Sequence, residues 1–107
     1  MTIEYIRYKV TEEQRQVFID TYKDASKELD ASEFCLAYEL AECEEEAGQF
    51  IVRIEWTSTD EHMNGFRKSE LFPAFFKKVK PYFSNIQEMR HYAMTGVTGR
   101  KTTTANN

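Results

Sequence analysis

Alternating hydrophobic and polar residues predict the strands of this chain. Residues 34–42 and 49–57 alternate clearly, and the acidic connection at residues 43–48 suits an antiparallel hairpin. Residues 3–10 are rich in Ile, Tyr and Val and predict a first strand, and residues 85–95 predict the last one. Four strands are therefore expected.

Helical spacing dominates between these strands. Thr11, followed three residues later by Gln14, forms a capping-box pattern that predicts the start of a first helix. The apolar stripe of this helix consists of Phe18, Tyr22, Ala25 and Leu29. It covers several turns and predicts one face packed on a sheet.

A second helical region follows the third strand. Ser58 and Glu61 form another capping box, which opens a helix expected to run through Phe66. The pattern restarts at Ser69, with an apolar face formed by Leu71, Phe72, Phe75, Phe76 and Val79. Pro73 fits the first turn of this segment, and Pro81 should stop it.

The order βαββαβ predicts an α+β fold, a ferredoxin-like sandwich with a four-stranded antiparallel sheet. Residues 1–95 form the expected domain. Residues 96–107 contain almost nothing to bury, so we expect a mobile C-terminal tail.

The two faces of the sheet differ in the sequence pattern. One face is nearly all apolar and should lie under the helices: Phe34, Leu36, Tyr38, Leu40, Phe50, Val52, Ile54 and Trp56. The other face mixes apolar and charged residues: Ile3, Tyr5, Cys35, Ala37, Glu39, Ala41, Ile51, Arg53 and Glu55. Two helices cannot cover both faces, so we predict a homodimer through the mixed face.

Composition narrows the choice of partners and compartment. The 107 residues carry a formal charge of −4, which provides no broad attraction for nucleic acid. No apolar run approaches the roughly 20 residues of a membrane span. Cys35 and Cys43 lie along one predicted strand, roughly 26 Å apart at ~3.3 Å per residue. At this distance they cannot form a disulfide with each other. A chain without a disulfide suits a reducing compartment, so we expect a cytoplasmic protein.

Several common chemistries lack their motifs. The four glycines form neither a phosphate-binding loop nor a dinucleotide fingerprint, and no GxSxG, CxxC or HxxxH pattern occurs. His62 and His91 are the only histidines, and their wide separation is a poor start for a metal site. We therefore expect neither a metal nor a cofactor.

An aromatic pocket with a few polar groups remains. Trp56 stands where the third strand meets the second helical region, and Tyr38 and Tyr8 should project from the same side of the sheet. His62 and Arg67 should overlook these rings, and such a cavity suits a planar, apolar ligand. Asn64 follows within the same turns, and His91 is a reserve candidate whose facing on the last strand is ambiguous.

A structural role is the alternative for each of these residues. Trp56 and Tyr38 could be core residues with hydrogen-bonded polar tips. His62 could lie on a helix surface, and Arg67 could pair with Glu70 or Glu61.

The strand segments CLAYEL and FIVRIEW, with its corner tryptophan, and the later SELFPAFF resemble the antibiotic biosynthesis monooxygenase domain family. The resemblance implies a dimeric α/β barrel built from two ferredoxin-like halves, each with a pocket between helices and sheet. Some members oxygenate polycyclic phenols and quinols without flavin, haem or metal, and others degrade haem.

The chain departs from this family at three positions. Phe76 stands where haem-degrading relatives have their iron-ligating histidine, and Ile6 replaces a polar residue of the first strand. Haem degradation is therefore not expected. Phe66 stands where quinol-oxidising relatives often carry a histidine.

The resemblance implies a cofactor-independent monooxygenase that uses dioxygen and a phenolic, quinol or polycyclic aromatic substrate. His62 would be the base, with a pKa near neutrality, and Arg67 would stabilise the anionic oxygen. Trp56, Tyr38 and Tyr8 would hold the rings. A non-catalytic dimeric binding or interaction protein is the alternative. A cavity of several hundred cubic ångströms lined by His62 or Arg67 would favour the enzyme, whereas a filled core with both residues in solvent would exclude it.

Overall fold

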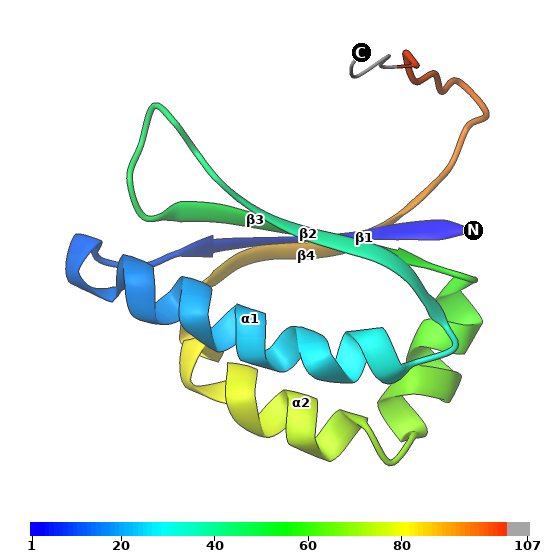
Figure 1. Ribbon diagram of the computed structural model, residues 1–107, viewed down its shortest axis with the longest axis horizontal. Helices are drawn as coiled ribbons and strands as arrows, with labels where there is room; N and C mark the ends of the chain where they lie inside the picture. Colours follow the sequence, from blue (N-terminus) through cyan, green and yellow to red (C-terminus); the bar gives the residue numbers. More distant parts are fainter. Residues whose placement is uncertain (103–107) are drawn as a thin grey trace.

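Two helices cover one face of a four-stranded antiparallel sheet (Figure 1). The computed structural model describes residues 1–102. Its strands are β1 (Thr2–Lys9), β2 (Cys35–Glu42), β3 (Gln49–Trp56) and β4 (Ile86–Ala93), in the spatial order β2-β3-β1-β4. The long helix is α1 (Arg15–Ala31), and the second is α2 (Phe72–Val79). The predicted ferredoxin-like α+β fold is confirmed.

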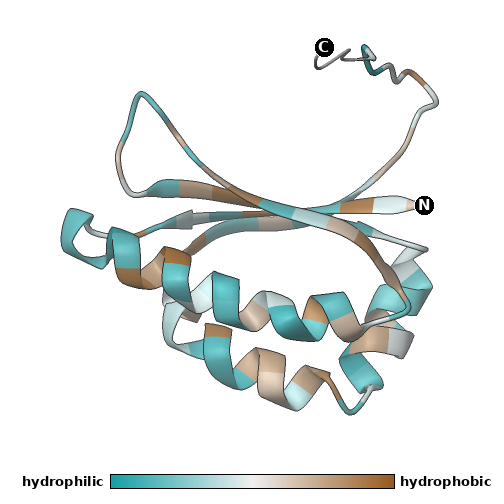
Figure 2. Ribbon diagram, viewed as in Figure 1, coloured by the Kyte–Doolittle hydropathy of each residue, from teal (hydrophilic) through white to brown (hydrophobic). Residues whose placement is uncertain are grey.

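The first helix forms as its sequence pattern predicts. The backbone N–H of Thr11 donates to Oε1 of Gln14, and a short 3₁₀ turn, η1 (Glu12–Gln14), precedes α1. The four residues of the predicted apolar stripe are the buried residues of α1. Both helices alternate between hydrophilic and hydrophobic bands in Figure 2, as expected for helices with one face on a sheet.

A register shift in β2 changes which of its side chains face the helices, so part of the predicted pattern is wrong. Cys35 pairs with Trp56 but Ala37 pairs with Glu55, so Leu36 is an extra residue in the strand. Leu36 is therefore 55% exposed, whereas Cys35 packs against the core that was predicted to exclude it. Because β2 is an edge strand, only one neighbour constrains its register, and a bulge is tolerated there.

The second helical region is more irregular than predicted. A π-helical turn, η2 (Glu61–Gly65), continues into a 3₁₀ turn, η3 (Phe66–Lys68), before α2 begins. A Cβ atom on Gly65 would lie 2.7 Å from the Phe34 ring, so glycine allows η2 to approach this ring closely. Pro73 stands in the first turn of α2, as predicted, and α2 ends before Pro81 although a 3₁₀ helix, η4 (Lys80–Asn85), follows.

The sheet face opposite the helices is uncovered in the single chain (Figure 1). Ile51 and Tyr92 on this face are 40% and 44% exposed, and Arg53 and Glu55 form an ion pair of 2.7 Å beside them. Apolar and charged groups therefore alternate on this face, as the strand pattern predicts.

Residues 94–102 form neither helix nor strand and run away from the helices (Figure 1). The predicted mobility of the tail at residues 96–107 stays a prediction, and residues 103–107 lie outside the described part. Within residues 1–102, none of the helices has the length and hydropathy that would let it cross a membrane.

Candidate functional site

A cavity of about 40 Å³ lies between the sheet and the second helical region. Four of the residues singled out in the sequence line it: Tyr8, Trp56, His62 and Arg67. Glu4, which the sequence analysis did not single out, lines it as well. The cavity therefore brings together residues from β1, β3, η2 and η3.

Glu4 and Trp56 form the buried side of this site. Trp56 ends β3 and is 1% exposed, and its Nε1–H donates to Oε1 of Glu4 at 3.0 Å. Glu4 is itself 3% exposed. Burial raises the pKa of the Glu4 carboxyl, while the Trp56 hydrogen bond and the charge of Arg67 act in the opposite direction. Glu4 is thus a stronger base than an ordinary surface carboxylate.

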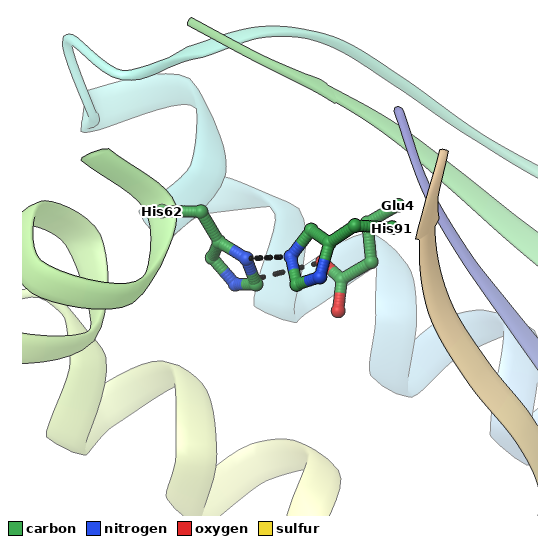
Figure 3. A group of neighbouring side chains, drawn as sticks. All are labelled: Glu4, His62 and His91. Carbon is green, nitrogen blue, oxygen red and sulfur yellow. Dashed lines mark hydrogen bonds and ion pairs between the residues drawn. The ribbon is translucent and has the colours of Figure 1, made fainter. Parts of the chain in front are cut away.

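His62 lies flat on the Trp56 ring. The ring centroids are 4.2 Å apart, the planes differ by 11°, and His62 is 4% exposed. Its Nδ1 lies 2.7 Å from Nε2 of His91, and its Nε2 lies 3.6 Å from Oε1 of Glu4 (Figure 3). His62 thus contacts a buried carboxylate through one nitrogen and a second imidazole through the other.

The protonation state of His62 differs from the expectation. Burial lowers the pKa of His62 to about 3, and the nearby charges of His91 and Arg67 contribute in the same direction. The predicted pKa near neutrality is therefore wrong. Because the ring is neutral at pH 7, its 3.6 Å approach to Glu4 is a polar contact and not an ion pair. Sequence position could not reveal this, since the pKa depends on burial.

The pairing of β1 with β4 brings His91 to the site. This residue stands directly opposite Glu4 in the β1–β4 pairing, which settles the facing that the strand pattern left ambiguous. The side chain is half-buried, and burial followed by the charge of Arg67 lowers its pKa. The two histidines, whose wide separation in the sequence was a poor start for a metal site, are hydrogen-bonded.

Arg67 brings a cation to the same cavity. Its Nε is buried and has no hydrogen-bond partner among residues 1–102. The guanidinium carbon lies 5.6 Å from the centre of the Phe72 ring. Within residues 1–102, Arg67 forms no ion pair with Glu61 or Glu70, the partners considered from sequence. The unpaired donor marks a place where a ligand oxygen could bind.

Tyr8 is a core residue at the edge of this site. It is 2% exposed, and its hydroxyl lies 2.7 Å from that of Tyr22. Burial raises the pKa of Tyr8 to about 12, so the phenol stays protonated. Tyr8 can therefore shape the cavity but is poorly suited to accept a proton there.

Two other predicted ligand-binding residues lie elsewhere. Tyr38 lines a separate groove of about 470 Å³ between α1 and β2, and its hydroxyl donates to Asp30 at 2.7 Å. Asn64 is exposed and donates to Asp60 at 2.6 Å. The structure does not bring either side chain to the Trp56 cavity.

The cavity size falls between the two expectations from sequence. A volume of about 40 Å³ holds one or two water molecules, far less than the several hundred cubic ångströms expected of an open substrate pocket. His62 and Arg67 nevertheless line the cavity instead of facing solvent. The polar groups of a site are present, but phenylalanines 66, 72, 75 and 76 fill much of the space around them.

Glu4 was not singled out from the sequence, although the alternation of β1 places it on the buried face of that strand. Residues 4, 6 and 8 of β1 share one face, and Tyr8 had been placed on the helix side. A carboxylate among apolar neighbours on that face needs a buried partner, which Trp56 provides. The π-helical turn around His62 could not be predicted, although such turns are frequent at functional sites.

Most of the chain is similar to a known protein family. Residues 1–78 match the model of a protein family described as antibiotic biosynthesis monooxygenase. This match includes Glu4, Trp56, His62 and Arg67, and it ends before the strand that carries His91.

Individual relatives are distant. An uncharacterised protein of Bacillus subtilis strain 168, YczJ, is 21% identical over 78% of this chain and 87% of its own length. The crystal structure of a candidate antibiotic biosynthesis monooxygenase from Bordetella bronchiseptica has a TM-score of 0.76 at 20% identity, covering 88% of this chain and 96% of its own. Another candidate, from Chloroflexus aurantiacus J-10-fl, has a TM-score of 0.72 at 15% identity and covers 92% and 96%. At these identities the structures show a shared fold.

Proposed function

Because this chain belongs to the antibiotic biosynthesis monooxygenase family, we propose that it is a monooxygenase acting on a phenolic, quinol or polycyclic aromatic small molecule. The reaction would use dioxygen and no bound cofactor. Family membership supports the general monooxygenase-like function, and the chemistry of the cavity supports the choice of substrate class.

The observation that carries this proposal is that a base, Glu4, and a cation, Arg67, line the same cavity. The carboxylate of Glu4 has a raised pKa, and Arg67 has a buried Nε without a partner among residues 1–102. A phenol bound between them could lose its proton to Glu4 and place its anionic oxygen on Arg67. The surrounding aromatic rings would exclude water and contact the rings of the substrate.

The electrons for oxygen reduction would come from the substrate. For an anthrone-like phenol, the deprotonated ring transfers one electron to dioxygen, and the two radicals combine into a carbon-bound peroxide. The peroxide anion takes up a proton from solvent, and the O–O bond then breaks with loss of water, so that one oxygen atom remains as a carbonyl and the other leaves in water. No external reductant is needed.

The two histidines would return the proton to solvent. His62, expected from sequence to be the base, has a pKa too low to hold a proton at pH 7. It can accept a proton on one nitrogen while releasing another to His91, which lies 2.7 Å away and is partly exposed. This relay restores the carboxylate of Glu4 after each turnover.

Substrate binding requires the cavity to widen. Two apolar side chains of its lining, Phe83 and Met89, are 48% and 40% exposed and have room to move outward. We expect their displacement to admit an aromatic ring without disturbing the β1–β3 pairing beneath Trp56.

The active protein would be a homodimer through the uncovered sheet face. Ile51 and Tyr92 are large apolar residues exposed there, and the Arg53–Glu55 pair adds the polar character common in dimer interfaces. Each subunit would then contain one Trp56 cavity.

Oxygen uptake by purified, untagged, EDTA-treated protein tests the proposal with a panel of hydroquinones and anthrone-like phenols. Arg67→Gln should lower turnover by about 10²–10³-fold, the usual cost of removing an oxyanion donor. Lys68→Gln changes an exposed cation of the same turn and should leave turnover unchanged. Equal losses in both variants would contradict the assigned role of Arg67.

The small cavity favours one competing function, a non-catalytic dimeric binding or interaction protein. If the wild-type chain accelerates oxygen uptake with none of the panel, the oxygenase proposal fails and this alternative stands.

A further inference from the structure

Three potential metal ligands from three separate elements meet at the wall of the cavity (Figure 3). Glu4 comes from β1, His62 from η2 and His91 from β4, and one ligand atom from each lies within 4.8 Å of the others. Two imidazoles and one carboxylate form a donor set that binds divalent transition metals such as Zn²⁺ and Fe²⁺.

A small movement of the side chains would bring the three ligand groups to the spacing of a bound state. Metal–ligand bonds of about 2.0–2.2 Å in tetrahedral geometry separate neighbouring ligand atoms by roughly 3.3–3.6 Å. Nε2 of His62 and Oε1 of Glu4 are 3.6 Å apart, within this range. The His62–His91 nitrogens, at 2.7 Å, are closer because they share a proton. These two distances involve different nitrogens of His62, and an ion would bind only one of them, so the His62 ring must shift for all three residues to bind the same ion. One ligand atom from each residue already lies within 4.8 Å of the others.

Trp56 orients two of the three ligands. Its Nε1–H holds the Glu4 carboxylate at 3.0 Å, and its ring stacks on His62. Such contacts to the ligands of a metal fix their orientation and strengthen binding. His91 is the partly exposed member of the group, so an ion could reach the site from its side, and the adjacent cavity leaves room for a water molecule as fourth ligand.

Arg67 limits the affinity of such a site. Its cation acts on Glu4 and on both histidines, and it would repel a second positive charge. We therefore expect micromolar binding, weaker than that of a structural zinc site.

We propose that Glu4, His62 and His91 form a binding site for a divalent transition metal ion of the Zn²⁺ class. The consequence for activity rests on the proposed function. A bound ion occupies both the carboxylate that accepts the substrate proton and the imidazoles that carry it away, so it should inhibit oxygenation.

The experiment uses the untagged chain and Co²⁺ as a spectroscopic probe, with Zn²⁺ in calorimetric titrations. Because the sequence contains only two histidines, a histidine-bound ion must involve this group. Visible d–d bands of four- or five-coordinate Co²⁺ and saturable 1:1 binding of Zn²⁺ are expected. His91→Gln and Glu4→Gln should each weaken binding by at least tenfold, with circular dichroism confirming that both variants are folded.

One control makes the result decisive. A Cys35→Ser and Cys43→Ser double variant removes both thiols, the other strong ligands of the chain, and should bind Zn²⁺ as the wild type does. Absence of saturable binding in the wild type, or unchanged affinity in a folded His91→Gln variant, would overturn the proposal.

Oxygen uptake separates this inference from the proposed function. Activity that persists in EDTA and is inhibited by Zn²⁺ supports both. Activity in a protein that does not bind Zn²⁺ refutes only the metal site, and Zn²⁺ binding without oxygen uptake on any substrate refutes only the oxygenase. Activity that requires an added metal would support the site and refute the cofactor-free reaction and the proposed inhibition.

Discussion

His62 should make the protein less stable in mild acid. Its pKa is about 3 in the folded chain and about 6.5 when exposed in the unfolded chain, so the unfolded state binds the proton more readily. Stability from this residue is therefore complete above pH 6.5 and is lost as the pH falls toward 3. Three ionisable groups face the ring, namely Glu4, Arg67 and His91.

The magnitude follows from the two pKa values. Between pH 8 and pH 5 the free energy of unfolding should fall by about 2 kcal/mol through His62 alone, at 1.36 kcal/mol per pKa unit. At pH 5 this figure depends mainly on the unfolded pKa, since the ring in the folded chain is neutral at that pH.

Urea denaturation of the wild type and His62→Gln at pH 8 and pH 5 measures this effect. Glutamine can still hydrogen-bond to His91 but does not titrate, and the remaining carboxylates and His91 are present in both proteins. The wild type should lose about 2 kcal/mol more than the variant over this range. An equal loss in both proteins, or an NMR titration of the His62 ring with a midpoint above pH 6, would refute the reasoning.

Three further predictions concern packing and assembly. Gly65→Ala should destabilise the chain by about 1–3 kcal/mol in urea denaturation, because the added Cβ meets the Phe34 ring at 2.7 Å, and stabilisation would disprove the close packing. Tyr8→Phe should cost about 1–3 kcal/mol by leaving the buried hydroxyl of Tyr22 without its partner, whereas the double variant with Tyr22→Phe should recover much of the loss in a double-mutant cycle. Ile51→Lys places a charge on the uncovered sheet face and should convert a dimer into monomers in light scattering, and an unchanged mass would argue against this interface.

The sequence by itself determined the order of the elements and the family resemblance. Periodicity is a local property, so the stripe on α1 and the alternation of β3 could be recognised without knowing what they contact. Turn chemistry is local as well, and the capping box at Thr11 and the end of α2 before Pro81 were correctly predicted.

Only the tertiary structure shows where the backbone departs from regular strands and helices. The bulge at Leu36 depends on how β2 pairs with β3, and one extra residue reverses the facing of the residues before it. The π-helical turn around His62 packs Gly65 closely against Phe34 from another part of the chain. Neither feature has a signature in a short window of sequence.

The chemistry of the site was likewise decided by tertiary contacts. Trp56 marked the end of β3 where these polar groups meet, but its partner Glu4 and the His62–His91 hydrogen bond join residues from opposite parts of the chain. The β1–β4 register places His91 opposite Glu4, and burial then shifts the pKa values of Glu4 and His62 in opposite directions. Residue types and spacing indicated which groups were available, whereas their distances and solvent exposure determine which of them can accept a proton.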